Sequence, residues 1–246
     1  RLNTLLINAY AAEPSRKQIQ EIRRKTKDQG AAFELRIMAT HGGTISTEAN
    51  ELARTLISGP IGGLVGGKNL ASQLGYRNVV CTDIGGTSFD IGLITEGQYS
   101  ITPYPEIARF VLSLPLVQIN SVGAGTGSYI RINPTNNRVE IGPDSAGARI
   151  GVCYKDGGVE TPTITDCHVI LGYIDPDYFL GGEVKLDPER ARRTIEEQIA
   201  RPLGLEVAQA AEGVISILEE NLKTTLHATI VGKGYSPLNY TLLNYG

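Results

Sequence analysis

Two apolar runs separated by four small residues constrain the fold of this chain more than any other feature. The runs are residues 78–84 (NVVCTDI) and 89–95 (FDIGLIT), and GGTS lies between them. Short runs rich in β-branched residues and bounded by glycine are typical of strands, and a short glycine-containing gap is typical of a hairpin. The sequence therefore predicts two antiparallel strands joined by a tight turn at Gly85 to Ser88.

The flanking segments predict a mixture of helices and strands. Helical periodicity, capping residues and stop glycines indicate helices at residues 14–29, 47–57, 61–74, 187–200 and 206–231. Strands are expected at residues 33–40 and just after Asp166, and short strands with ordered loops are expected between residues 103 and 165. Helices and strands alternate without a repeat, so we expect an α/β fold with a mixed sheet flanked by helices.

The helix expected at residues 61–74 is unusually rich in glycine. Each glycine costs a helix about 1 kcal/mol relative to alanine. Gly62, Gly63, Gly66 and Gly67 therefore need a physical reason, and close approach of another part of the chain or of a ligand would supply one.

Composition excludes several classes of protein. The 246 residues carry a formal net charge of -3 without a basic cluster, which argues against nucleic-acid binding. No apolar run reaches the roughly 20 residues that cross a bilayer, so we expect no membrane association and a cytoplasmic location. Three widely spaced cysteines favour reduced core thiols over a disulfide framework. Both ends of the sequence are expected to continue into a larger protein, because the last apolar run stops abruptly at Gly246.

The turn between the two predicted strands has the composition of a phosphate-binding loop. Gly85 and Gly86 allow the backbone to expose N–H groups, and the hydroxyls of Thr87 and Ser88 add donors. Asp83 would repel a phosphate unless a divalent cation or an attacking nucleophile lay between them. The alternative is an ordinary tight hairpin in which Asp83 and Asp90 only accept hydrogen bonds from turn amides.

Longer motifs resemble those of one protein family. RLNTLLINAY, THGGTIS, SGPIGGLVGG, DIGGTSFDIGLI, SVGAGTGSYIRI, GPDSAGA, TDCHVILGYI and FLGG are similar, in that order, to segments of the hydantoinase A/oxoprolinase family. The resemblance covers nearly the whole chain and implies one partial family domain at residues 1–246, with a phosphate hairpin at 78–97 and a late helical segment at 187–231. It also implies an actin-like ATPase (ribonuclease H-like) fold that uses ATP with Mg²⁺ or Mn²⁺.

The same resemblance assigns roles to residues of the hairpin. Asp83 would be the catalytic carboxylate and would hold the metal through a bound water. Gly85, Gly86, Thr87 and Ser88 would cradle the phosphates, and Asp90 would orient that loop. His41 stands where the family more often has asparagine before the glycines, so its role stays open.

Several segments are most similar to the ATP-dependent ketone carboxylases that act on acetone and acetophenone. That likeness implies a ketone and bicarbonate as substrates, a 3-oxo acid as product, and unlike subunits as partners in a hetero-oligomer. The alternative within the family is an ATP-dependent hydantoinase or 5-oxoprolinase that hydrolyses a cyclic amide. A nucleotide-switched scaffold protein is the alternative of a different class.

Three other features admit both a functional and a structural interpretation. Cys167 and His168 are potential metal ligands, but neighbouring residues of a strand point to opposite faces. The glycines between 123 and 127 resemble a nucleotide loop but lack the lysine of a P-loop, so an ordered turn that lines the active cleft is the simpler reading. Asp166 either faces a substrate or caps a turn.

Overall fold

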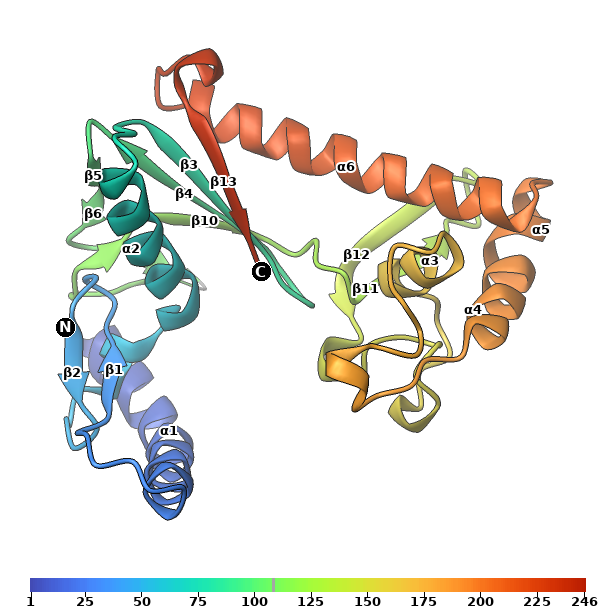
Figure 1. The fold of residues 1–246 in the computed structure, drawn as a ribbon. Coiled ribbons are helices and arrows are strands. Elements are labelled where there is room, and N and C mark those ends of the chain that lie inside the picture. The colour runs from blue at the N-terminus through green and yellow to red at the C-terminus, as the bar shows by residue number, and fades with distance from the viewer. Residues whose placement is uncertain (108) are drawn as a thin grey trace. The chain divides into compact units, whose positions relative to one another are not determined.

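The computed structural model describes residues 1–107 and 109–246, which form two compact units. The first unit comprises residues 1–81, 92–120 and 239–245, and the second comprises residues 82–91, 121–238 and 246. Each unit combines helices with strands (Figure 1), so the predicted mixed α/β class is confirmed. None of the helices in these two residue ranges is long and apolar enough to cross a bilayer.

The first unit is built around a mixed sheet and helix α2. Strands β10, β4, β3 and β13 are hydrogen-bonded neighbours in that order, and β5 pairs with β4. The core beneath the sheet contains Ile61 and Leu64 of α2 with Val79 of β3 and Ile94 of β4. The elements of this part of the chain are α1 (Leu2–Asp28), β1 (Arg36–Met38), β2 (Thr44–Ser46), the 3₁₀ helix η1 (Leu52–Thr55), α2 (Ser58–Gln73), β3 (Val79–Ile84), β4 (Phe89–Thr95), β5 (Gln98–Tyr99), β6 (Ile101–Thr102), β7 (Glu106–Ile107), β8 (Phe110–Val111), β9 (Leu116–Val117), β10 (Ile119–Val122) and β13 (Thr241–Tyr245).

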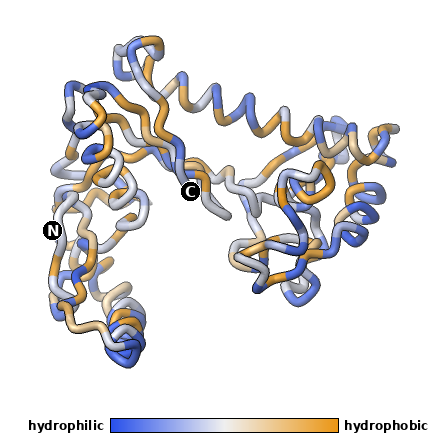
Figure 2. Tube along the Cα trace, in the orientation of Figure 1, coloured by the Kyte–Doolittle hydropathy of each residue, from blue (hydrophilic) through white to orange (hydrophobic). Residues whose placement is uncertain are grey.

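The second unit packs an antiparallel strand pair against helices. Its core joins Ile130 of β11 to Ile164 of α3, Ile195 of α4 and Val214 of α6. The α6 helix carries apolar residues at helical spacing, visible as alternating colours along it in Figure 2, and its predicted bounds are confirmed. The elements are β11 (Ser128–Ile132), β12 (Val139–Ser145), α3 (Ile164–Ile170), α4 (Pro188–Ile195), a π-helical turn η5 (Glu196–Ala200), α5 (Arg201–Leu203), α6 (Val207–Val231) and the 3₁₀ helices η2 (Gly147–Arg149), η3 (Lys155–Gly157), η4 (Leu180–Gly182) and η6 (Pro237–Asn239).

The first helix begins earlier than predicted. The sequence predicted a start at Pro14, but α1 runs from Leu2 to Asp28 with Pro14 inside it. An interior proline costs a helix about 3 kcal/mol. Contacts of the first turns offset this cost, because the Asn8 side chain accepts a hydrogen bond from the Ala53 amide (2.9 Å) and the Thr4 hydroxyl accepts one from the Ser113 amide (2.8 Å).

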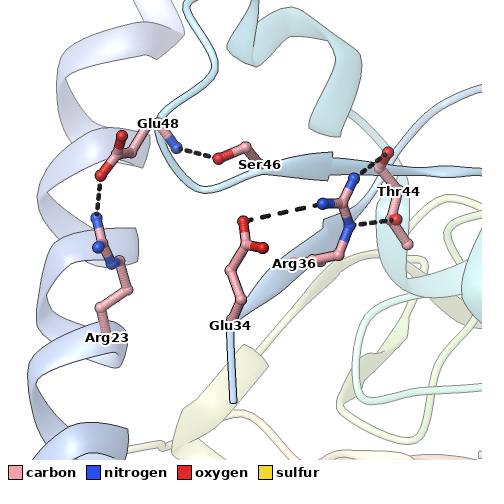
Figure 3. A network of polar contacts seen from close by, with 6 residues as sticks. All are labelled: Arg23, Glu34, Arg36, Thr44, Ser46 and Glu48. Carbon is pink, nitrogen blue, oxygen red and sulfur yellow. Dashed lines mark hydrogen bonds and ion pairs between the residues drawn. The ribbon is translucent and has the colours of Figure 1, made fainter. Parts of the chain in front are cut away.

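An ion pair joins the second half of α1 to the segment just after β2, and further polar contacts connect β1 with β2 (Figure 3). Arg23 of α1 pairs with Glu48 at 3.2 Å, and Arg36 of β1 donates to the Thr44 hydroxyl at 2.9 Å. The α1 helix has no fully buried residue, as expected for a surface helix.

Two predicted elements of the first unit are wrong in extent or type. The strand expected at 33–40 contains only Arg36–Met38, because the Thr40 amide bonds to Arg54 instead of a neighbouring strand. The helix expected at 47–57 is only the short 3₁₀ helix Leu52–Thr55. A longer helix would need the Ala53 amide, which the Asn8 side chain already occupies.

The glycines of α2 are explained in part by close packing. A β-carbon added at Gly63 would lie 2.5 Å from the Tyr245 ring, and one at Gly67 would lie 2.7 Å from the Cys81 sulfur. Side chains of β13 and β3 therefore occupy the space that a larger residue would need at these two positions. Gly66 has open space around its α-carbon, so packing does not account for it.

Gly67 and Gly66 form a matched pair for a stability test. Gly67→Ala should destabilise the protein by about 1–3 kcal/mol, because overpacking forces the strands away. Gly66→Ala should stabilise it by up to about 1 kcal/mol through helix propensity alone. Urea unfolding of both variants measures the difference, and equal effects would contradict the packing explanation.

Candidate functional site

The predicted hairpin is confirmed. Strands β3 and β4 are hydrogen-bonded neighbours, and the Gly85 amide donates to the Ser88 carbonyl at 3.0 Å to close the turn. The tip of the hairpin, residues 82–91, belongs to the second unit. All six residues predicted to form the site therefore lie on one short, well-defined segment.

The apex of the turn is open. Gly86 and Thr87 are exposed, whereas Gly85 and Ser88 are half-buried. The amides of Gly86, Thr87 and Ser88 donate to no carbonyl within residues 1–107 and 109–246. Backbone donors left free in a glycine turn suit an anion such as a phosphate.

The two carboxylates of the hairpin have different surroundings. Asp90 is buried and accepts a hydrogen bond from the Ser88 hydroxyl at 2.8 Å, so it anchors the end of the turn. Asp83 is half-buried and has no hydrogen-bond or ion-pair partner in the described chain. Its burial, and secondly the nearby charge of Asp90, raise the pKa of Asp83 above its ordinary value. A cation beside Asp83 would relieve both effects, and an unpaired carboxylate is a ligand that Mg²⁺ prefers.

A second glycine turn packs directly on the hairpin turn. The Thr126 amide donates to the Gly85 carbonyl at 3.0 Å, and the Gly127 amide donates to the Gly86 carbonyl at 2.8 Å. The Ser128 amide closes this second turn by donating to the Gly125 carbonyl at 3.0 Å. The ordered turn that we predicted at residues 123–127 is present, and its partner is the backbone of the hairpin turn.

Sequence reasoning missed the role of Gly246. A β-carbon added there would lie 2.6 Å from the Ile84 carbonyl oxygen and 2.8 Å from Asp83 Oδ1. Gly246 therefore borders the free carboxylate of Asp83. An isolated glycine after an apolar strand is the only sequence signal for such a close approach.

The segment after Asp166 is a helix, and the strand predicted there is wrong. Thr163 caps helix α3, and Asp166 at the third helical position completes a capping box. The Asp166 carboxylate is fully buried and also accepts hydrogen bonds from the amides of Val152 (3.1 Å) and Cys153 (2.7 Å). Of the two interpretations of Asp166, the structure supports the capping one.

Cys167 and His168, considered above as potential metal ligands, follow on the same helix. No group of three or more potential metal ligands occurs within residues 1–107 and 109–246. Cys167 is buried in the apolar core of the second unit, and burial raises the pKa of its thiol well above the ordinary range. Burial also lowers the pKa of His168, whose ring lies edge-on to Tyr173.

His41 lies in the first unit, in the turn that joins β1 to β2. Its Nδ1 atom is buried without a hydrogen-bond partner in the described residues. A hollow of about 340 Å³ in the same unit, beside α1, contains none of the residues predicted to form the site.

An open glycine turn, a free carboxylate beside it and a buried carboxylate behind it define a class of site. The backbone amides of such a site would hold a phosphate group, and Asp83 would hold a divalent cation that neutralises its charge. Comparison of the whole sequence with known protein families identifies the class of protein more narrowly. The sequence pattern of the hydantoinase/oxoprolinase family matches residues 1–246, and the chain belongs to that family.

Individual relatives within the family include two carboxylase subunits. The chain is 55% identical over 246 residues to the acetone carboxylase beta subunit of Xanthobacter autotrophicus. It is 36% identical over 248 aligned residues to the acetophenone carboxylase gamma subunit of Aromatoleum aromaticum. Both alignments include the whole of this chain, which spans about a third (34%) of the length of either relative.

Solved structures show the same relationships. The nucleotide-free structure of an acetone carboxylase, from work on ATP-dependent acetone carboxylation, matches with a TM-score of 0.94 at 55% identity and covers 99% of this chain and 34% of that one. The ATP-dependent caprolactamase of Pseudomonas jessenii matches with a TM-score of 0.77 at 30% identity and covers 99% of this chain and 36% of that one. The fold of this chain thus occurs as part of an acetone carboxylase and as part of a caprolactamase.

Proposed function

We propose that this chain is the phosphate-binding part of an ATP-dependent ketone carboxylase subunit. The observation that carries the proposal is the open Gly85–Ser88 turn with the unpaired Asp83 beside it, in a chain 55% identical to an acetone carboxylase subunit. The substrates would be ATP, bicarbonate and acetone or acetophenone, and the product a 3-oxo acid. The cation would be Mg²⁺ or Mn²⁺.

Each hairpin residue then has a defined task. The exposed Gly86 amide and Thr87 hydroxyl would bind phosphate oxygens, with Gly85 and Ser88 shaping the turn. Asp83 would hold the cation through a bound water, and the cation would neutralise charge on the phosphates. Asp90 would keep the turn in place through its hydrogen bond with Ser88. Prepositioned donors of this kind supply most of the catalysis in phosphoryl transfer.

Phosphoryl transfer would overcome the low reactivity of the two carbon substrates. An unactivated ketone and bicarbonate combine poorly at neutral pH. Transfer of the terminal phosphoryl group of ATP to a substrate oxygen, with ADP leaving, converts that oxygen into part of a leaving group. The reaction thus draws on ATP to make a carbon–carbon bond. Because both carboxylase relatives are named as subunits, we also propose that unlike chains complete the enzyme.

The second candidate is an ATP-dependent cyclic amide hydrolase. It is favoured by the caprolactamase subunit alpha of Pseudomonas jessenii (32% identity) and by 5-oxoprolinase 1 of Arabidopsis thaliana (27% identity). The same turn and Asp83 would serve it, because an amide oxygen can also receive a phosphoryl group. Only the acceptor of that group differs between the two candidates.

Measuring ADP release by the full-length protein with its copurifying subunits separates the candidates. We expect release to depend on both a ketone and bicarbonate, and caprolactam, hydantoin and 5-oxoproline to be inactive. Release that depends on a cyclic amide and not on bicarbonate would establish the hydrolase instead. ATP binding without acceptor-dependent release would favour a nucleotide-switched scaffold and contradict both enzymatic candidates.

A further inference from the structure

The position of the hairpin turn is set by the second glycine turn. Gly85 and Gly86 each give their carbonyl oxygen to an amide of that turn, at 3.0 and 2.8 Å. A β-carbon at Gly125 would lie 2.5 Å from the Thr87 nitrogen and 2.6 Å from the Gly85 oxygen, and one at Gly127 would lie 2.7 Å from the Gly86 oxygen. Two backbones in such contact cannot move independently.

The second turn is itself fixed to helix α3. The Thr126 carbonyl accepts hydrogen bonds from both the amide (2.8 Å) and the hydroxyl (3.0 Å) of Thr165, while the Thr126 amide donates to Gly85. Thr165 lies in the first turn of α3, next to the buried carboxylate of Asp166. Thr126 therefore connects the hairpin turn to the capped start of helix α3.

We propose that Gly125, Thr126, Gly127 and Thr165 are positioning residues for the phosphate turn. They would act through the Gly85–Thr87 backbone, which they hold where its donors would meet the phosphate. This inference rests on the proposed phosphate-binding function of the hairpin. A misplacement of about 1 Å can lower a catalytic rate about 100-fold, so a rigid support of this kind has a measurable consequence.

Gly125→Ala tests the support, and Gly123→Ala is its matched control. Alanine at 125 must push on backbone atoms of the hairpin turn, whereas a β-carbon at 123 meets Pro143 at an ordinary 3.5 Å. In the full-length protein we expect Gly125→Ala to lower kcat about 100-fold and to raise the KM for ATP about tenfold. Gly123→Ala should stay within about twofold of wild type for both constants.

Thr165 provides a milder test that does not depend on how well Gly125→Ala folds. Thr165→Val removes the hydroxyl bond to Thr126 but keeps the amide bond, so we expect kcat to fall about three- to tenfold. Thr165→Ser restores a hydroxyl and should return kcat to within about twofold of wild type. If Gly125→Ala does not fold, the Thr165→Val and Thr165→Ser variants alone test the positioning role.

Thermal melting of every variant separates positioning from stability. A positioning role requires kcat per folded molecule to fall, whereas a purely structural role would lower only the melting temperature. The inference is overturned if Gly125→Ala matches Gly123→Ala, or if Thr165→Val matches wild type, while Asp83→Asn is inactive. If Asp83→Asn is also fully active, the proposed function itself has failed.

Discussion

Asp83→Asn is expected to lower acceptor-dependent ADP release about 100-fold or more in the full-length protein. Asparagine keeps the shape of the side chain but removes the charge that would hold the cation. Asp83 has no protein partner in the described chain, so its replacement breaks no hydrogen bond or ion pair there. Burial and Asp90 raise the pKa of Asp83, so removing the charge should leave stability at neutral pH unchanged or slightly higher.

Two comparison variants show whether the loss of turnover is specific to Asp83. Thr87→Ala should lower turnover only about tenfold, because it deletes one exposed hydroxyl and leaves the backbone donors in place. Cys167→Ala should spare turnover, because that thiol is buried in the core. A well-folded Asp83→Asn protein with near-normal turnover would reduce the hairpin to a structural element.

Asp166→Ala is expected to destabilise the protein by about 3–5 kcal/mol. The carboxylate accepts bonds from the amides of Val152, Cys153 and Thr163 and from the Thr163 hydroxyl, at 2.7 to 3.1 Å. Removing it leaves several buried donors unsatisfied and deletes half of the capping box of α3. Asp166→Asn retains one acceptor oxygen and should cost less.

Urea unfolding measures this loss, with Asp144→Ala as the control. Asp144 is exposed, and its one ion-pair partner among residues 1–107 and 109–246 is Arg131, at 3.7 Å. Its removal should cost at most about 1 kcal/mol. Equal losses for the two alanine variants would contradict the role given to Asp166 in capping α3 and in bonding the Val152 and Cys153 amides.

The hairpin could be predicted because its signals are local. Two β-branched runs and a glycine pair specify strand, turn and strand without reference to the rest of the chain. The helices at 187–200 and 206–231 were predictable for the same reason: Asp187 and Pro188 mark a helix start, and the long helix repeats its apolar residues every three to four positions.

Helix α3 was missed although a local signal for it exists. The apolar residues around Cys167 and His168 are compatible with a strand or a buried helix segment, which periodicity alone does not separate. Thr163 and Asp166, three residues apart, form a capping box, which is a sequence signal for the start of a helix rather than a strand. That signal was available in the sequence and was outweighed by the β-branched residues.

The remaining errors depend on contacts between distant segments. The first turns of α1 form before Pro14 because Asn8 and Thr4 bond to residues more than 40 positions away. The same Asn8 bond occupies the Ala53 amide that a longer helix at 47–57 would have used. The packing of Gly125 and Gly127 on the hairpin turn is equally non-local, since glycine composition says nothing about which backbone comes close.

The central proposal is that the Gly85–Ser88 turn binds the phosphates of ATP and that Asp83 holds the accompanying cation. A structure of the full-length protein with Mg²⁺ and a non-hydrolysable ATP analogue tests it most directly. We predict the terminal phosphate within hydrogen-bonding distance of the Gly86 amide or the Thr87 hydroxyl, and the cation linked to Asp83 through water. A nucleotide bound with its phosphates and cation away from this turn would contradict the claim.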